Sequence, residues 1–495
     1  MKALKFTLVI LSFFILSEIT AQSFSAKVID KETREPVSYA TIKTGENQGI
    51  ITNEEGEFSF LLTQVKQPLD SIYVSYMGYE TKGVFLEPQD SLEILLTPKI
   101  FELKQVFLST EVLTAKEIIE RVKENLDKNY QVNLSKKKIF FRQSDITRVK
   151  KMDFGFKKSS IEELNKKFID SISRMIPKKS SYYKEVVGDF YGDYTQQKLY
   201  INKAAELYDK KNDLSAEGLG KELERIFNEN VKKDSYIKIK SGIFSTKMQV
   251  DSIIKENENA KEEYEKRSGT GNKYFQEQIK DRISDLYEQL FFNEDTKIDV
   301  LDKSSRYNFV LENYTVIDGM TVYIIPFSPK GSKDFKGTLY VNTQDFAIVR
   351  MDFQNVNPIR KFSLLGITLR NNIYRGKMLF SKDKNGAYSP KYLELEDGMY
   401  VGLDRPLKVI EKNKHVKGRR KQNELSLALD IGMNQVVKYE LVVFESETIS
   451  NNDYENVTEN TEVIATYLSQ YDPTFWQEYS IMEPNEAIEN FKIVE

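Results

Sequence analysis

The feature that most constrains this fold is a two-residue alternation of apolar and polar side chains, which occurs in two separate parts of the chain. Residues 23–98 hold six short alternating runs divided by turn residues, and residues 296–447 hold successive hairpins. Strand side chains point alternately to opposite sides of a sheet, so such runs predict strands with one buried face. Between them, residues 110–295 place apolar side chains mostly at helical spacing. We therefore expect an α+β multidomain protein, because both periods are present.

The N-terminus has the order of a secretory signal. Lys2 and Lys5 precede an apolar run over residues 6–16, and Ala21 supplies a small residue for cleavage. The apolar run is too short to span a bilayer, so residues 1–22 are predicted to be removed on export. We expect a periplasmic or outer-membrane-associated protein, soluble after cleavage near Ala21.

Composition excludes several classes of function. The chain has no cysteine, which rules out disulfides, thiolate metal sites and a lipid-anchored cysteine, so we do not expect a lipoprotein. His415 is the only histidine, and it lies in a charged loop, so neither a histidine zinc site nor a serine triad is expected. The 72 basic and 75 acidic residues nearly balance, which gives no argument for nucleic acid as a partner. No cofactor motif is present either.

Residues 23–98 are predicted to form a small antiparallel β-sandwich. The expected strands cover residues 24–29, 39–43, 49–52, 57–62, 71–76 and 92–96. Turn chemistry separates these strands, with Gly56 and Gly78 suited to left-handed backbone positions.

Three motifs in this part resemble the carboxypeptidase regulatory-like domain. They are residues 26–42 (AKVIDKETREPVSYATI), residues 49–58 (GIITNEEGEF) and residues 74–79 (VSYMGY). The resemblance implies a transthyretin-like, non-catalytic module that often precedes cell-envelope proteins of Bacteroidota-type bacteria. Ala26 and Arg34 stand where the family usually has glycine, so the first strand and first turn are less permissive than in typical members.

Residues 110–295 are predicted to be mainly helical. Thr114 and Glu117 have the spacing of a capping box, and further helices are expected over residues 159–175, 216–231, 250–267 and 273–292. A strand near residues 138–142 is also expected. The charged stretch over residues 255–267 is interpreted as a solvated helix face, with an interaction role as the alternative.

Residues 296–495 are predicted to form an antiparallel β-meander with a helical, aromatic tail. The expected strands cover residues 314–317, 320–327, 336–341, 346–353, 375–381, 388–396, 424–429 and 435–445. Their arrangement resembles a half-barrel, as in Bacteroidota envelope proteins that carry the same N-terminal module and, more loosely, in periplasmic lipoprotein carriers. In the tail, Pro473 suits the first turn of a helix, and Phe475, Trp476 and Tyr479 are expected to fill a groove on the meander.

Two candidate sites follow. The first is a basic loop that could contact anionic lipid head groups, with a plain solvated loop as the alternative. Its cations are Lys412, Lys414, Lys417, Arg419, Arg420 and Lys421. The second is an apolar face of the meander that could hold a ligand if it lines a continuous cavity. Its side chains are Tyr323, Ile325, Leu339, Ile348 and Met351.

The function expected from the sequence is that of a non-catalytic cell-envelope protein that binds a protein or another outer-membrane component. The alternative is a periplasmic carrier of a lipid or other apolar ligand inside the curved meander. A hydrolase would require carboxylates that converge in a pocket, and with 75 acidic residues the sequence alone cannot single out such a pair.

Overall fold

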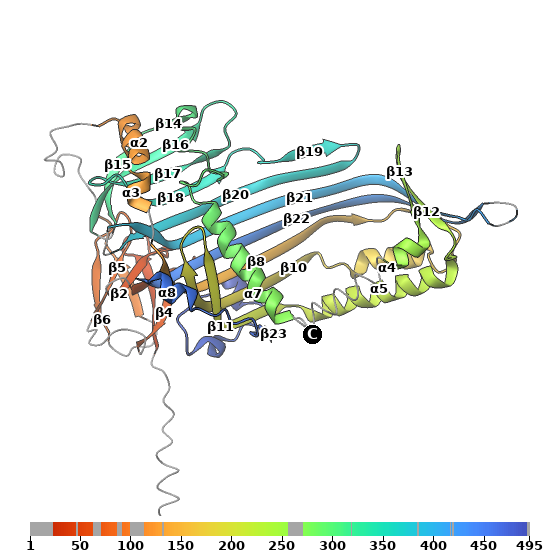
Figure 1. Cartoon of the computed structure of the whole chain (residues 1–495), viewed down its shortest axis with the longest axis horizontal. Helices are drawn as coiled ribbons and strands as arrows, with labels where there is room; N and C mark the ends of the chain where they lie inside the picture. Colours follow the sequence, from red (N-terminus) through yellow and green to blue (C-terminus); the bar gives the residue numbers. More distant parts are fainter. Residues whose placement is uncertain are drawn as a thin grey trace, which may run out of the picture. The chain divides into compact units, whose positions relative to one another are not determined.

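A computed structural model describes residues 23–45, 48–62, 71–86, 92–99, 113–130, 133–255, 271–317, 319–383, 386–415, 417 and 420–492 (Figure 1). The chain divides into two compact units. Unit 1 comprises the N-terminal residues as far as Pro98 together with Asp472–Asn485, and unit 2 comprises the remaining residues. The predicted signal over residues 1–22 lies outside the described residues. No described helix is both long and apolar enough to cross a membrane.

Unit 1 contains two small sheets, which confirms the predicted sandwich. One has the order β4-β1-β7, formed by β4 (Glu57–Leu61), β1 (Ser23–Asp30) and β7 (Leu92–Leu96). The other has the order β3-β2-β5-β6, formed by β3 (Gln48–Ile51), β2 (Thr41–Gly45), β5 (Ser71–Ser75) and β6 (Lys82–Phe85). The strand β6 was not predicted, and β1 pairs with β7 in parallel, whereas the other pairings are antiparallel. The core includes Val28, Ile42, Ile72, Val74 and Leu96, all fully buried.

The first and third sequence motifs of unit 1 meet in one hydrogen-bond cluster. The hydroxyl of Tyr79 donates to Asp30 Oδ2 at 2.5 Å, and Asp30 Oδ1 accepts from the backbone N–H groups of Glu32 and Thr33. These bonds, led by the one from Tyr79, lower the pKa of Asp30. Arg34 has φ +64° in the following turn, which is the conformation that explains why the family prefers glycine there.

The C-terminal tail differs from the prediction in structure and in place. Its described residues contain the short strand β23 (Thr466–Leu468), the 3-10 turn η3 (Pro473–Trp476) and the short helix α9 (Glu486–Glu489). Asp472–Asn485 belongs to unit 1 and not to the meander, and Asn53 Nδ2 donates to the carbonyl of Pro484 at 2.7 Å. Pro484, which has no N–H and disfavours helical backbone in the residue before it, lies between η3 and α9.

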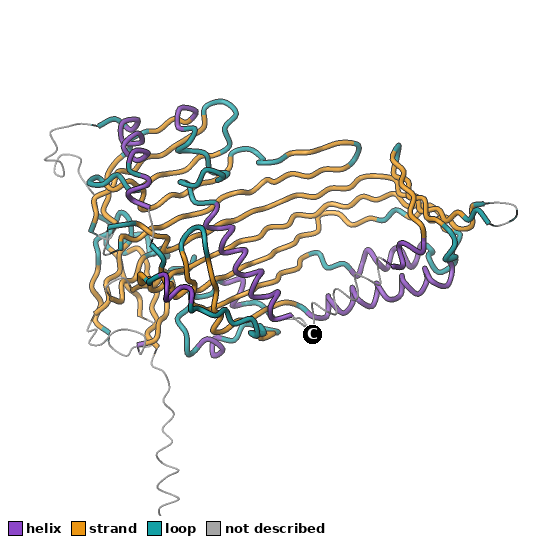
Figure 2. Tube along the Cα trace, viewed as in Figure 1, coloured by secondary structure: helices purple, strands orange, loops and turns teal. Residues whose placement is uncertain are grey.

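Unit 2 is built on a ten-stranded antiparallel sheet whose strands run side by side in Figures 1 and 2. The order is β11-β10-β8-β22-β21-β20-β18-β17-β16-β15. Its strands are β11 (Gln197–Tyr208), β10 (Lys179–Gly192), β8 (Ser135–Asp153), β22 (Lys421–Thr448), β21 (Tyr388–Lys412), β20 (Ile367–Lys382), β18 (Ile348–Asn355), β17 (Phe335–Asn342), β16 (Met320–Pro329) and β15 (Asn313–Ile317).

Shorter strands extend this sheet locally. They are β9 (Phe156–Ser159) on β22, β12 (Tyr236–Ser241) on β21, β13 (Phe244–Gln249) on β12, β14 (Tyr307–Phe309) on β16, β19 (Lys361–Leu364) on β20 and β23 (Thr466–Leu468) on β11. The predicted hairpins of the meander are confirmed, although β21 and β22 are far longer than expected.

The described helices of unit 2 include α2 (Ala115–Glu124), α3 (Leu126–Tyr130), α4 (Lys166–Met175), α5 (Lys210–Asn230), α7 (Gly271–Glu288), α8 (Asn451–Glu455) and α9, with the 3-10 turn η2 (Ser304–Arg306). The capping box of α2 is present, with Thr114 Oγ1 accepting from the N–H of Glu117 and Glu117 accepting from the N–H of Thr114. Residues 250–255 are helical, and the charged stretch after them lies outside the described residues.

The prediction of a mainly helical region over residues 110–295 was wrong in its proportions. The region contributes β8, β10 and β11, three long strands of the main sheet, as well as the expected helices. The strand pattern is hidden because polar side chains occupy buried positions. Arg142 of β8 and Glu185 of β10 lie opposite each other, and both are buried.

One face of the main sheet carries helices at two places. The α7 helix lies over the part of the face that includes Leu395 and Val437. These two side chains and residues of α7 line the same pocket. The α4 helix packs Ile169 against Leu427 and Leu429 farther along β22. We call this the helix-covered face, and Figure 1 shows α7 crossing the long strands and α4 near their far end.

Candidate functional site

The middle of the helix-covered face carries apolar side chains that remain open to solvent. Met399 is 38% exposed and Leu369 is 40% exposed, and both lie between the parts contacted by α7 and α4. Strand register places them in adjoining rows with further apolar residues of the same face, since side chains directly opposite in a sheet point to the same side. We call this set the open strip, and it comprises Phe362, Leu364, Leu369, Met399, Val401 and Met433.

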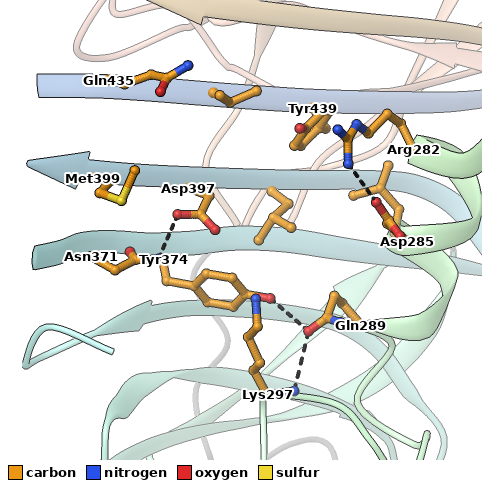
Figure 3. Close-up of a pocket in the computed structure, with 13 residues that line it drawn as sticks. Arg282, Asp285, Gln289, Lys297, Asn371, Tyr374, Asp397, Met399, Gln435 and Tyr439 are labelled. Atoms are coloured by element: carbon orange, nitrogen blue, oxygen red, sulfur yellow. Dashed lines mark hydrogen bonds and ion pairs between the residues drawn. The ribbon is translucent and has the colours of Figure 1, made fainter. Parts of the chain in front are cut away.

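A pocket of about 480 Å³ joins the α7 side of this strip, because Met399 belongs to both (Figure 3). Its walls come from α7, the segment that follows α7, and the strands β20, β21 and β22. The lining residues are Arg282, Asp285, Leu286, Gln289, Lys297, Asn371, Tyr374, Leu395, Asp397, Met399, Gln435, Val437 and Tyr439. Nine of these residues are polar and four are apolar, so the pocket has a mixed lining.

Hydrogen bonds fix several of the polar groups in the pocket. Tyr374 donates its hydroxyl to Gln289 Oε1 at 2.8 Å, which joins β20 to the end of α7. Asn371 donates from Nδ2 to Asp397 Oδ1 at 2.9 Å, and this bond leaves Asn371 Oδ1 buried with no hydrogen-bond partner among the described residues. An unsatisfied buried acceptor is unfavourable, so a bound N–H or O–H donor would be stabilised there.

The charges of the pocket are arranged in neighbouring groups. Arg282 pairs with Asp285 at 3.0 Å, and the ammonium of Lys297 lies 4.7 Å from the centre of the Tyr374 ring. Burial raises the pKa of Tyr374 and of Tyr439, so both hydroxyls stay protonated and can donate hydrogen bonds at neutral pH. Across the described part of the chain, no group of three or more acidic or histidine side chains could hold a metal ion.

The five residues predicted as an apolar ligand face do lie on one side of the meander. In the strand register, Leu339 lies opposite both Ile325 and Met351 on its two neighbouring strands. Val341 likewise lies opposite Tyr323 and Ile348. Their side chains are buried, with Tyr323 the most exposed at 5%. None of the five lines the pocket described above. Their role as ligand contacts stays a prediction.

The predicted basic loop spans the end of β21 and the start of β22. Lys412 and Lys421 lie directly opposite each other in the strand register. The cations between them, Lys414, Lys417 and Arg420, are exposed. Arg419 lies outside the described residues. Lys421 forms an ion pair with Glu424. His415 is exposed in the same loop, as expected.

Sequence reasoning missed the pocket. Its polar residues are spread from Arg282 to Tyr439 and meet only after the sheet has formed. The one available signal was the continuous alternation over residues 393–403 and 431–441, which indicates strands longer than those predicted.

Comparison with known proteins identifies unit 1. Residues 24–108 match the model of the CarboxypepD_reg-like domain, and no curated protein matches the chain. Among solved structures, the Pseudomonas aeruginosa MucA/MucB complex matches with 8% identity and a TM-score of 0.17, over 66% of this chain and 93% of that one. A second structure, MucB in complex with MucA(peri), matches with 8% identity and the same TM-score, over 68% and 99% of the two chains.

Proposed function

We propose that this chain is an exported, non-catalytic binding protein of the cell envelope. In this proposal, unit 2 holds a segment of a partner protein on the open strip, with one end of that segment in the pocket under α7. The predicted secretory signal and the CarboxypepD_reg-like domain, whose family resemblance implies an envelope setting, support the location.

The observation that carries the proposal is the open strip itself. A half-buried Leu or Met side chain that becomes fully covered contributes about 1 kcal/mol, so several side chains together favour binding of an apolar segment. Phe362 and Leu364 are 46% and 53% exposed on the neighbouring strand β19, which extends the same apolar surface. Exposed apolar residues that adjoin in this way are typical of interaction surfaces.

The lining of the pocket favours a polypeptide over a lipid. An acyl chain offers no hydrogen bond to Asn371 Oδ1 and would cover the exposed amide of Gln435 without replacing its bonds to water, which is unfavourable. A peptide offers backbone N–H groups, for which the Asn371 Oδ1 atom is a suitable acceptor. The alternative of a lipid carrier is therefore less well supported than a protein-binding role.

The contacts of the acidic groups support a non-catalytic role. Asp285 pairs with Arg282, and Asp397 accepts a hydrogen bond from Asn371, so each carboxylate has a structural partner within the pocket. His415 lies in the loop between β21 and β22 and does not line the pocket.

Site-specific photo-crosslinking in cells tests the proposal. A photoreactive residue at position 369 or 399 should give a protein adduct of one defined mass. The matched control is position 370, because Arg370 is the exposed neighbour of Leu369 and points to the opposite side of the sheet. Protein adducts at 369 and 399 but not at 370 are expected.

Two outcomes would contradict the proposal. Adducts that contain lipid and no protein would favour the carrier alternative. Adducts that form equally at 369 and 370 would show that the open strip is not the binding surface. A Met399→Asp substitution should also remove the adduct at 369, because the charge would have to be buried under the partner.

A further inference from the structure

A group of lysines gathers at the end of the main sheet, far from α7. The hairpin of β12 and β13 pairs there with the last residues of β21 (Figure 1). Lys238 lies directly opposite Lys247, and Lys240 lies directly opposite Lys408, so all four side chains point to the same side. Like charges placed directly opposite each other destabilise a sheet, so this arrangement has a cost.

The described part of the chain does not neutralise this lysine group. No carboxylate among the described residues forms an ion pair with Lys238, Lys240 or Lys247. The pKa of Lys238 is lowered, first by the charge of Lys240 and further by burial and by Lys247 and Lys412. Positive potential therefore accumulates on this side of the hairpin.

An apolar side chain projects from the turn of the same hairpin. Ile243 is 83% exposed, and Phe244 next to it is 52% exposed. The turn is held in place by Arg405, which is buried, donates to the carbonyl of Ser241 and lies 4.9 Å from the centre of the Phe244 ring. A large aliphatic side chain is thus presented to solvent by an anchored turn.

The basic loop between β21 and β22 continues this charged region. Register places Lys412, at the start of the loop, directly opposite Tyr236 of β12. Lys414 lies 5.9 Å from the centre of the Tyr236 ring, so the loop and the hairpin are in contact. Lys417 and Arg420 add further exposed cations.

We propose that this end of unit 2 docks on an anionic membrane surface. The lysines of β12, β13 and β21 and the cations of the loop face the lipid phosphates, and Ile243 inserts among the head groups. A bilayer surface provides negative charge and an apolar phase within a few ångströms of each other, which matches an exposed isoleucine beside unneutralised lysines. This site is separate from the open strip, and its test does not depend on the partner protein.

Binding of the purified protein to vesicles tests this inference. The triple variant Lys238→Glu/Lys240→Glu/Lys247→Glu is compared with a matched control, Lys116→Glu/Lys128→Glu/Lys336→Glu. The control lysines are also exposed, lie on α2, α3 and β17, and give the same net charge. Each lysine at an anionic surface contributes about fivefold in affinity, so the triple variant should bind phosphatidylglycerol vesicles about a hundredfold more weakly than the wild type. The control should stay within about threefold of the wild type.

The Ile243→Ser variant tests insertion. It should bind phosphatidylglycerol vesicles several-fold more weakly. Its affinity for soluble polyglutamate, an anionic polymer without an apolar phase, should stay unchanged. Circular dichroism checks that each variant is folded.

Several results would overturn the inference. They are no binding of the wild type to phosphatidylglycerol vesicles, equal binding to vesicles of phosphatidylcholine alone, or equal losses in the triple variant and its control. A triple variant that loses binding to polyglutamate but not to vesicles would identify an acidic protein as the occupant instead.

Discussion

Removal of Arg142 should destabilise unit 2 more than a typical core substitution. Its side chain is 1% exposed, and its Nε atom lies 2.7 Å from Glu185 Oε1 while Nη1 lies 4.0 Å from Glu440 Oε2. In an Arg142→Met variant, the methionine side chain fills the space of the aliphatic part of the arginine, but the positive charge is lost. Glu440 keeps the ammonium of Lys438 at 2.9 Å, whereas Glu185 loses its guanidinium contact.

The expected cost follows from the burial of Glu185, which is fully inaccessible to solvent. Breaking a buried ion pair by removing one partner costs about 3 to 5 kcal/mol, because the remaining charge is left without compensation. Urea unfolding followed by far-ultraviolet circular dichroism should show this decrease in the free energy of unfolding.

A second substitution separates the charge effect from packing. The double variant Arg142→Met/Glu185→Met should recover most of the lost stability, since a buried ion pair replaced by apolar groups is often nearly neutral. A single variant within about 1 kcal/mol of the wild type, or a double variant no more stable than the single one, would show that the buried charge of Glu185 does not depend on Arg142.

Three further predictions concern other parts of the chain. Trp476 is 2% exposed in unit 1, so Trp476→Ala should cost about 3 to 5 kcal/mol and lower the unfolding temperature in calorimetry. Burial lowers the pKa of Lys137 to about 8, so the unfolded state binds more protons above that pH and stability should rise with pH from 8 towards 10.5. Relative to Lys137→Met, the wild type should gain up to roughly 3 kcal/mol across this range in urea unfolding, and a constant difference would contradict the linkage. Thr114→Ala should lower the free energy of unfolding of unit 2 by about 1 kcal/mol through loss of the α2 cap, whereas Thr114→Ser should have little effect.

The parts of the fold that were predictable are those with local signals. The strands of unit 1 were found because their alternation is short and regular and because glycines mark the turns. Gly56 and Gly78 do adopt positive φ angles, of +77° and +81°. The capping box of α2 was found because it needs only two residues at fixed spacing.

Other elements were missed because distant residues determine them. The two strands predicted over residues 424–429 and 435–445 are one strand, β22, and Gly432 in the supposed break pairs normally with Gly402. A Cβ at position 432 would lie 2.8 Å from the hydroxyl of Tyr400, so this glycine serves a close approach and not a turn. The identity of that neighbour cannot be derived from the sequence around Gly432.

The candidate site was predictable only in part. The open strip around Met399 is the binding surface proposed above, whereas the predicted ligand face around Leu339 is buried and its role stays a prediction. Sequence alternation identifies which residues share a face, but not which part of that face a helix covers. The position of α7, which sets the border of the strip, depends on packing against β11 through contacts such as the bond from Gln276 to the carbonyl of Leu199.

The most direct test of the central claim is the affinity of the crosslinked partner segment for purified variants that differ on the two faces of β20 and β21. We expect Met399→Asp to weaken binding at least tenfold, because a charge would be buried under the segment, and Arg370→Asp on the opposite side to leave the affinity within about twofold. Equal affinities for both variants, or a larger loss in Arg370→Asp, would contradict the claim that the partner lies on the open strip.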